Sequence, residues 1–246
     1  MTRIHRLDRQ TINSIAAGEV VERPASVAKE LIDNALDAGA SIIRMSMESG
    51  GIKLFSLEDD GSGMSREDAL LSLESHATSK LVTTDDLFDI QTMGFRGEAL
   101  PSIASVSRLE LRTRRREDEA GTRIVIEGGE KTFEGPLGMA PGTAVICRDL
   151  FFNTPARYKF LRTDASEAGA LADLAGKMAL TRPDVSFRLD RKEDGKEILY
   201  TPGDNDLLSA IYAVFGQEAA GAMQALEGRD SGIQIAGYMT GPEGSR

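Results

Sequence analysis

The sequence predicts a fold that combines helices with a largely antiparallel sheet. Residues 27–38 repeat their apolar positions with the period of a helix, which gives one apolar and one polar face. The runs over residues 41–47 and 52–57, and further runs between residues 108 and 148, alternate as strands do and are separated by glycines. With 246 residues and 41% hydrophobic composition, the chain is long enough for one large domain or for one and a half ordinary ones.

The first part of the chain is expected to hold helices around one hairpin. In chain order the expected elements are a helix over residues 11–17 ended by Gly18, a helix from Pro24 to about Ala38 ended by Gly39, strands over 41–47 and 52–57 that turn at Gly50-Gly51, a loop over 59–63 and a helix over 66–74. Residues 75–93 are polar and poorly periodic, so they could form a mobile lid.

The second part is expected to begin with an antiparallel meander. In chain order the expected elements are strands over 108–113, 122–127 and 143–148, a helix over 165–180, a hairpin of strands 185–189 and 197–201 that turns at Asp194-Gly195, a helix over 206–215 and a strand over 233–239. Pro202-Gly203-Asp204 is the expected domain boundary, between a first domain over residues 1–203 and the start of a second over residues 204–246. The second segment is too short to form a domain alone.

Composition limits the classes of protein to consider. The net charge of −10 and the pI near 4.9 exclude a surface that is basic throughout, so any nucleic-acid contact must come from a local patch. The single cysteine, Cys147, excludes an internal disulfide framework and lies in an apolar run, which favours a buried structural thiol over a nucleophile. No signal peptide and no run of eighteen apolar residues is present, so a soluble, cytoplasmic protein without membrane contact is expected.

Glu30 and Asn34 lie one helical turn apart at the edge of the apolar face of the second helix. One interpretation is a solvated polar face. The other gives each residue a role at one site: an Asn carbonyl oxygen can ligate magnesium, and a carboxylate one turn away can orient and deprotonate a water that attacks a phosphorus. Magnesium prefers few protein oxygens together with phosphates and waters, so it would arrive with a nucleotide.

Asp59 follows an expected strand and precedes Gly61-Ser62-Gly63, where ligands are commonly held. A carboxylate there can accept a hydrogen bond from the exocyclic amine of adenine, whereas guanine carries a carbonyl at that position. Two alternatives remain: an Asx-type turn at Asp60-Gly61, and a calcium loop. The calcium loop is disfavoured, because its alternating acidic spacing and closing Glu are missing.

Two further segments carry groups suited to a polyanion. Residues 94–100 place glycines just before a helix start, where backbone amides favour phosphate. Upstream, Thr78-Ser79-Lys80 adds two hydroxyls and an ammonium. The chain has no G-x-x-x-x-G-K-[ST], G-x-G-x-x-G, H-E-x-x-H or G-x-S-x-G motif, and its two histidines and one cysteine cannot make a structural zinc site.

Taken in order, Glu30-x-x-x-Asn34, Asp59-x-Gly61-x-Gly63 and Gly94-x-Arg96-Gly97 resemble the ATPase superfamily of DNA gyrase B, the ninety-kilodalton heat-shock chaperone, histidine kinases and MutL. Residues 94–100, 13–24 and 149–161 are similar to the MutL mismatch repair proteins, and this resemblance covers residues 3–163 closely and the remainder more loosely. It implies an α/β (α+β) sandwich of helices packed on a mixed, largely antiparallel sheet with an ATP lid, followed by a second β-α domain resembling a ribosomal-protein module.

The resemblance implies that Glu30 is the general base, Asn34 the magnesium ligand and Asp59 the adenine reader. Thr143, after Gly142, would complete the base pocket. The phosphate-binding lid would comprise Gly63, Thr78, Ser79, Lys80, Gly94, Phe95, Arg96, Gly97, Glu98 and Leu100. The implied function is a mismatch repair ATPase that uses ATP and Mg²⁺, dimerises on ATP binding through its N-terminal arm, and coordinates a MutS-type mismatch recognition protein with a downstream nuclease or helicase.

One departure and three alternatives accompany this resemblance. The family brings a lysine to the γ-phosphate from later in its second domain, and no segment before Arg246 matches that region, so we expect ATP binding with weak turnover. The alternatives are a topoisomerase ATPase subunit, a histidine kinase and a non-hydrolysing, nucleotide-gated scaffold. Any DNA contact should be weak and salt-dependent, through residues 112–116 or through Arg157, Lys159 and Arg162; solvated surface charge is the alternative for both patches.

Overall fold

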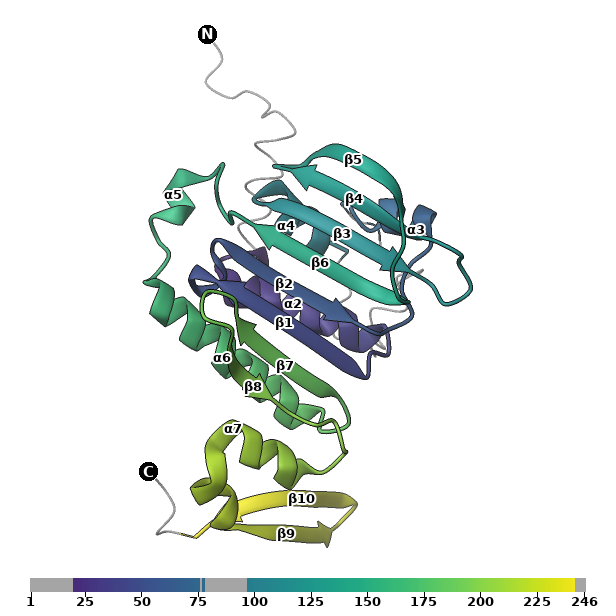
Figure 1. Ribbon diagram of the computed structural model, residues 1–246. Helices are drawn as coiled ribbons and strands as arrows, with labels where there is room; N and C mark the ends of the chain where they lie inside the picture. The colour runs from purple at the N-terminus through teal and green to yellow at the C-terminus, as the bar shows by residue number, and fades with distance from the viewer. Residues whose placement is uncertain (1–19, 76, 78–96, 242–246) are drawn as a thin grey trace.

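The computed structural model describes residues 20–75, 77 and 97–241 (Figure 1). Helices lie against one face of a large sheet, and a smaller unit follows at the C-terminal end. The helices are α2 (Pro24–Asp37), α3 (Arg66–Leu71), α4 (Ala99–Ser105), α5 (Pro155–Tyr158), α6 (Asp164–Thr181) and α7 (Leu207–Gly221), with a short 3-10 turn, η1 (Ser49–Gly51). The strands are β1 (Ile42–Glu48), β2 (Leu54–Asp59), β3 (Arg108–Arg114), β4 (Gly121–Glu127), β5 (Glu130–Leu137), β6 (Gly142–Arg148), β7 (Ser186–Arg191), β8 (Lys196–Tyr200), β9 (Met223–Asp230) and β10 (Ile233–Thr240).

The large sheet has eight strands in the order β5-β4-β3-β6-β2-β1-β7-β8. Strands β1 and β7 are parallel, and every other neighbouring pair is antiparallel. The sheet is therefore mixed and largely antiparallel, which confirms the fold class that the sequence predicts.

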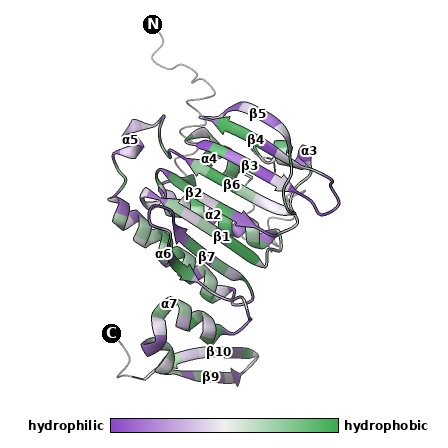
Figure 2. Cartoon of the chain, viewed as in Figure 1, coloured by the Kyte–Doolittle hydropathy of each residue, from purple (hydrophilic) through white to green (hydrophobic). Residues whose placement is uncertain are grey.

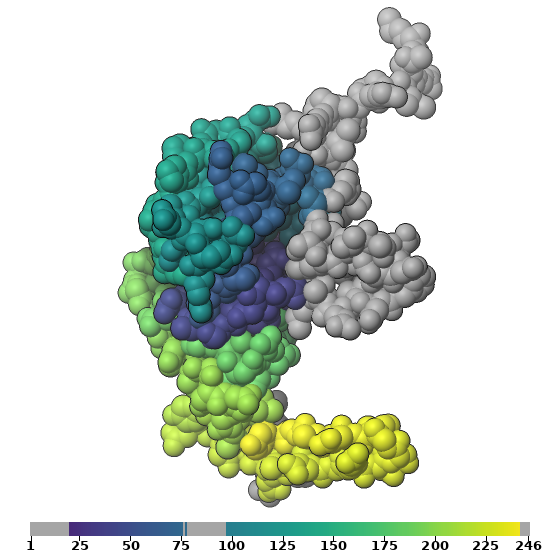
Figure 3. All heavy atoms as spheres, turned by 90° about the vertical axis from the view of Figure 1, so that its right-hand side faces the viewer, coloured from purple at the N-terminus to yellow at the C-terminus, as the bar shows by residue number. Residues whose placement is uncertain are grey.

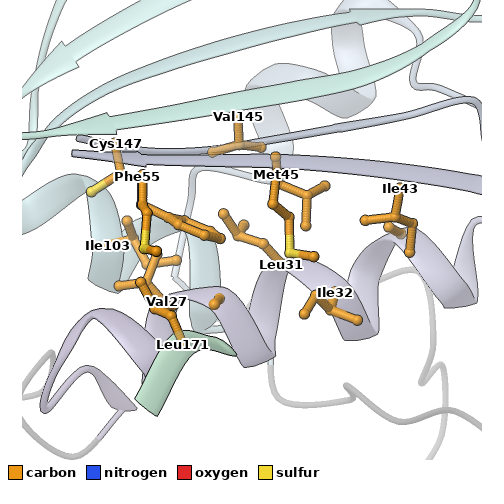
Figure 4. Packing of buried hydrophobic residues seen from close by; sticks show 14 of the residues in the cluster. Val27, Leu31, Ile32, Ile43, Met45, Phe55, Ile103, Val145, Cys147 and Leu171 are labelled. Carbon is orange, nitrogen blue, oxygen red and sulfur yellow. The ribbon is translucent and has the colours of Figure 1, made fainter. Parts of the chain in front are cut away.

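The core lies between this sheet and helices α2, α4 and α6. Side chains on one face of the central strands, such as Met45 and Phe55, point toward α2, whose apolar face carries Val27 and Leu31 (Figure 4). Cys147 is buried in this core, and burial raises the pKa of its thiol to about 11, so it is an inert structural thiol as expected. Figure 2 shows the hydrophobic residues distributed along these strands, whereas β9 is mostly hydrophilic.

Most of the expected elements are present. The helix ahead of Gly39 ends there with that glycine at a φ of +72°, and the strands on either side of Gly50-Gly51 pair as a hairpin. The meander expected for residues 108–148 is wrong in one respect: β5 pairs with β4, and β6 crosses to lie between β3 and β2. Strand β5 escaped prediction because it is an exposed edge strand that contains Gly135 and Pro136. The helix expected over residues 11–17 and nearly all of residues 75–93 lie outside the described residues.

The C-terminal unit consists of α7 and the hairpin of β9 and β10, which pair with each other and not with the large sheet. The hairpin of β9 and β10 projects to one side of the rest of the chain (Figure 3). Strand β9 was also not predicted, because nearly all of its side chains are exposed and its sequence lacks apolar alternation. Within the described residues, no helix is both long and apolar enough to cross a membrane.

Candidate functional site

Helix α2 begins and ends where its sequence dictates. Arg23 is the extended N-cap residue, Pro24 occupies the first turn, where a missing amide costs nothing, and Gly39 follows the last turn. The apolar face is buried, while Glu30 and Asn34 are half-buried at its edge. Both side chains interact with neighbouring groups of the chain. They therefore lie one turn apart at the border between core and surface, as their spacing predicts.

A second pair of polar residues on α2, Lys29 and Asp33, lies one position before Glu30 and Asn34. The Lys29 ammonium lies 2.7 Å from the Asp33 carboxylate, which is buried. The hydrogen bond to Asp33 raises the pKa of Lys29 and outweighs the effect of its partial burial, so Lys29 stays protonated. The carboxylate beside Asn34 is thus neutralised within its own helix.

Asp59, the last residue of β2, is 8% exposed. Its Oδ1 accepts a hydrogen bond from the Gly61 amide at 2.9 Å, and the Thr143 amide of β6 also donates to its carboxylate. Burial raises the pKa of Asp59 to about 6, although these two amides partly oppose the shift. Among the described residues no salt bridge involves Asp59, so the carboxylate is desolvated without a compensating cation.

Hydroxyl groups extend the polar network around Asp59 across the sheet. The Thr143 and Thr113 hydroxyls lie 3.0 Å apart on paired strands β6 and β3. The Thr113 hydroxyl also accepts from the Met64 amide at 2.9 Å, just after Gly63. Thr113 is a site residue that was not predicted from the sequence, because its register opposite Thr143 depends on the strand order.

Asp60, next to Asp59, has a different environment. Its carboxylate accepts from the amides of Ser41 and Ile42, both at 2.8 Å, and from the Ser41 hydroxyl. Partial burial alone would raise its pKa, but these hydrogen bonds outweigh it and lower the pKa of Asp60. Asp60 therefore fastens the end of β2 to the start of β1. The Asx-type turn considered for Asp60-Gly61 forms instead through Asp59, whose Oδ1 receives the Gly61 amide.

Glycines allow the backbone to crowd around Asp59. A Cβ at Gly61 would lie 2.9 Å from the Ala38 carbonyl oxygen and 3.0 Å from Asp59 Oδ1. At Gly63 (φ +66°) it would lie 2.1 Å from the Arg114 carbonyl oxygen, and at Gly142 (φ +128°) 2.1 Å from the Asp59 carbonyl oxygen. The Ser62 amide also donates to the Ala38 carbonyl at 3.0 Å. The end of the helix that carries Glu30 and Asn34 thus meets the loop that follows Asp59.

Only part of the expected phosphate-binding segment is described. Thr78, Ser79, Lys80, Gly94, Phe95 and Arg96 lie outside the described residues. Gly97 has a φ of +64°, and a Cβ there would lie 2.5 Å from the Ala77 carbonyl oxygen, so Gly97 and Ala77 lie in close contact. Glu98 is the N-cap residue of α4, and Leu100 packs against the core from its first turn.

The donor chemistry fits a nucleotide with its own metal better than a resident metal ion. No group of three or more His, Cys, Asp or Glu side chains that could hold a metal occurs in the described part of the chain. Glu30 and Asn34 offer oxygen atoms, which magnesium prefers, but too few to bind it without phosphates and waters. A hollow of about 680 Å³ lies elsewhere, between α3 and strands β4 and β5, and none of the expected site residues lines it.

Comparison with known proteins supports a nucleotide site. Residues 22–131 match a family model described as histidine kinase-, DNA gyrase B-, and HSP90-like ATPase. The whole chain is 50% identical to the DNA mismatch repair protein MutL of Desulforudis audaxviator (strain MP104C) and spans 43% of it. It is also 50% identical over 244 residues, 99% of this chain, to MutL of Geobacter sulfurreducens (strain ATCC 51573 / DSM 12127 / PCA), of which it spans 40%.

Solved structures give the same result. The chain is similar to the Aquifex aeolicus MutL ATPase domain complexed with ADP, with 31% identity and a TM-score of 0.68 over 85% of this chain and 73% of that one. The N-terminal domain of a DNA repair protein shares the fold with a TM-score of 0.77 at 23% identity, over 96% of this chain and 74% of that one. The chain spans about two fifths of the length of these curated relatives.

Proposed function

Since the chain belongs to the MutL family of DNA mismatch repair proteins, we propose that it binds ATP with magnesium and hydrolyses it slowly, in a site built around α2 and the end of β2. The observation that carries the proposal is Asp59, a buried carboxylate without a salt bridge in the described structure and with a pKa raised to about 6. An uncompensated buried carboxylate is costly to keep, and its desolvation would be offset by a ligand that donates to it.

Asp59 serves as the adenine reader. Its carboxylate accepts a hydrogen bond from the N6 amine, while guanine would present a carbonyl to the same oxygen and be repelled. Thr143 lies beside Asp59: the Thr143 amide donates to the Asp59 carboxylate, and the Thr143 hydroxyl is hydrogen-bonded to that of Thr113. These contacts support a base pocket that selects adenine over guanine.

Glu30 and Asn34 act at the phosphate end. Glu30 orients and deprotonates the attacking water, and Asn34 offers its carbonyl oxygen to magnesium. When bound, magnesium supplies charge neutralisation at the phosphate oxygens. Their position, half-buried at the edge of the core, supports these roles, because it leaves each side chain partly accessible.

The phosphates are enclosed by a lid formed by Gly63, Thr78, Ser79, Lys80, Gly94, Phe95, Arg96, Gly97, Glu98 and Leu100. The close approach of Gly97 to Ala77 and the start of α4 just beyond Gly97, where backbone amides favour an anion, support this part of the proposal. The proposed domain boundary stays at residues 203 and 204, between β8 and α7.

For the whole protein we propose a mismatch repair ATPase that dimerises on ATP binding and coordinates a MutS-type mismatch recognition protein with a downstream nuclease or helicase. One of the two candidate DNA patches lies around Arg112 and Arg115. In the described structure Arg112 pairs with Glu110, and Arg115 with Asp118. Arg157, Lys159 and Arg162 form the second candidate patch, and binding at either patch should weaken steeply with salt.

The proposal is tested by titrating the chain with a non-hydrolysable ATP analogue in a calorimeter, with and without magnesium. We expect magnesium-dependent binding by the wild type and its loss in Asn34→Ala and Asp59→Asn. Asp60→Asn is the matched control, because it removes the neighbouring carboxylate that the chain itself satisfies. The corresponding guanine analogue should not bind. A folded wild-type chain that binds neither nucleotide would falsify the proposal.

A further inference from the structure

A buried carboxylate at the other end of α2 takes no part in the site proposed above. Glu167, in the first turn of α6, is 1% exposed. Its Oε2 accepts hydrogen bonds from Arg23 Nε at 3.0 Å and Nη2 at 2.9 Å, and its Oε1 accepts from the Arg162 backbone amide at 3.0 Å. Two guanidinium donors that converge on one carboxylate oxygen fix direction as well as distance. Glu167 therefore holds Arg23, 144 residues away in sequence, in one orientation.

Arg23 is the residue from which α2 starts. Its carbonyl oxygen accepts the amides of Ser26 at 2.9 Å and Val27 at 3.4 Å, which close the first turn. Arg23 makes no side-chain cap of its own to α2. Its guanidinium instead pairs with Glu167, so the side chain at the start of α2 binds α6 and does not cap its own helix.

The first turn of α6 is in turn fixed against the sheet. A Cβ at Gly50, which has a φ of +62°, would lie 2.5 Å from the Asp164 carbonyl oxygen and 2.8 Å from Glu167 Cβ. At Gly51 it would lie 2.8 Å from Leu171 and 2.9 Å from Pro24. The turn η1 between β1 and β2 thus touches the starts of both helices with no room for a side chain. Glu167 is anchored to the sheet on one side and to α2 on the other.

We propose that Glu167 is a positioning residue for the nucleotide site, which it serves through Arg23 without touching the nucleotide; this inference rests on the function proposed above. Arg23 is the N-cap residue and Glu30 lies seven residues later, so the two are about two turns, or roughly 10 Å, apart along the helix. A rigid helix transmits a shift or rotation of its first turn to Glu30 and Asn34. A misplacement of about 1 Å can cost about a hundredfold in an enzyme site.

The inference predicts an unequal effect on the two halves of the site. Asp59 is held by its own strand and by the amides of Gly61 and Thr143, and no hydrogen bond among the described residues joins these groups to Arg23 or Glu167. Loss of the pair should therefore weaken contacts made through α2, which include the magnesium-dependent ones, and spare adenine recognition. A purely structural ion pair would weaken both halves together as the chain unfolds.

The experiment compares two ligands for each variant of the 246-residue chain: the magnesium complex of a non-hydrolysable ATP analogue, and ADP in the presence of a chelator. Glu167→Gln keeps the shape and the acceptor for the Arg162 amide but loses the charge. Arg23→Gln removes the other partner, and Arg23→Lys restores the cation. Ala175→Gly is the matched control, because it loosens the buried face of the same helix away from the pair.

We expect Glu167→Gln and Arg23→Gln to weaken binding of the magnesium complex by about tenfold and metal-free ADP by less than about twofold. Arg23→Lys should recover most of the loss, and Ala175→Gly should affect the two ligands alike. Circular dichroism at the assay temperature verifies folding. Unchanged binding in Glu167→Gln, or an equal loss for both ligands, overturns the inference while the proposed function stands. A wild type that binds neither ligand overturns both.

Discussion

Each end of helix α2 faces a buried carboxylate, and the two carboxylates are satisfied in opposite ways. At the start of the helix, Glu167 is 1% exposed and receives a guanidinium and a backbone amide. Near its end lies Asp59, the last residue of β2, which is 8% exposed and receives two backbone amides and, in the described structure, no cation. The first arrangement is complete within the chain, whereas the second leaves a charge that the chain does not neutralise.

The difference separates a residue that shapes the site from one that meets a ligand. A buried ion pair fixes geometry, because removing either partner is costly. A buried carboxylate with a raised pKa and only neutral donors destabilises the free chain and is more often a functional group. Burial alone thus does not distinguish the two roles, and the charge of the partners does.

The largest expected effect comes from filling the crowded space at the Asp59 end. Gly142→Ala would place a Cβ 2.1 Å from the Asp59 carbonyl oxygen, at a φ of +128° that alanine rarely adopts. We expect a loss of about 2–4 kcal/mol in the free energy of unfolding, measured by urea denaturation, together with loss of nucleotide binding.

Gly138→Ala is the matched control for this change, because a Cβ there meets no atom within 4 Å. It lies in the connection between β5 and β6, just before Gly142, and should leave stability and binding nearly unchanged. Equal effects of the two substitutions would show that the crowding around Asp59 is not what the site depends on.

A change of opposite sign is expected for Asp59→Asn in the free chain. Because burial raises the pKa of Asp59 from 3.8 to about 6, ionising it at neutral pH costs roughly 1–3 kcal/mol of stability. Asparagine keeps one carbonyl acceptor and carries no charge, so the variant should be more stable at about pH 7 although it no longer binds adenine nucleotides. The measurement is the urea midpoint of both proteins without ligand. Glu167→Gln should behave oppositely and lose stability, since it breaks a completed pair.

Part of the fold and of the candidate site could be predicted from the sequence. The helix of Glu30 and Asn34 and the hairpin after it follow from local patterns, since caps, glycines and periodicity lie within a few residues of each other. Strands β5 and β9 could not be found, because exposure on both faces removes the apolar alternation. The sequence points to Asp59 through its place after a strand. It gives no sign of Glu167, whose partner Arg23 is 144 residues away.

A smaller effect is expected in the pH dependence of nucleotide binding, which reports on the protonation of Asp59. Adenine recognition requires the ionised carboxylate, so the affinity for the ATP analogue should fall by about tenfold between about pH 7 and pH 5, as Asp59 is protonated through its pKa of about 6. Stability moves the other way: the folded chain binds the proton more tightly than the unfolded chain, so the contribution of Asp59 to stability rises as the pH falls from about 6 toward 4. Calorimetry and urea denaturation over this range measure both.

The smallest effect is expected at Asp60. This residue is adjacent to Asp59 in sequence, but its carboxylate, like that of Glu167, is satisfied by groups of the chain itself. Its hydrogen bonds from Ser41 and Ile42 lower its pKa, so its stabilising contribution is present above the usual carboxyl pKa and is lost as the pH falls through the lowered value. Asp60→Asn should cost about 0.5–1 kcal/mol at neutral pH, discounted for its solvent exposure, and leave nucleotide affinity within about twofold. If Asp60→Asn instead abolished binding while Asp59→Asn did not, the adenine reader would be the outer carboxylate, and the raised pKa of Asp59 would have a purely structural origin.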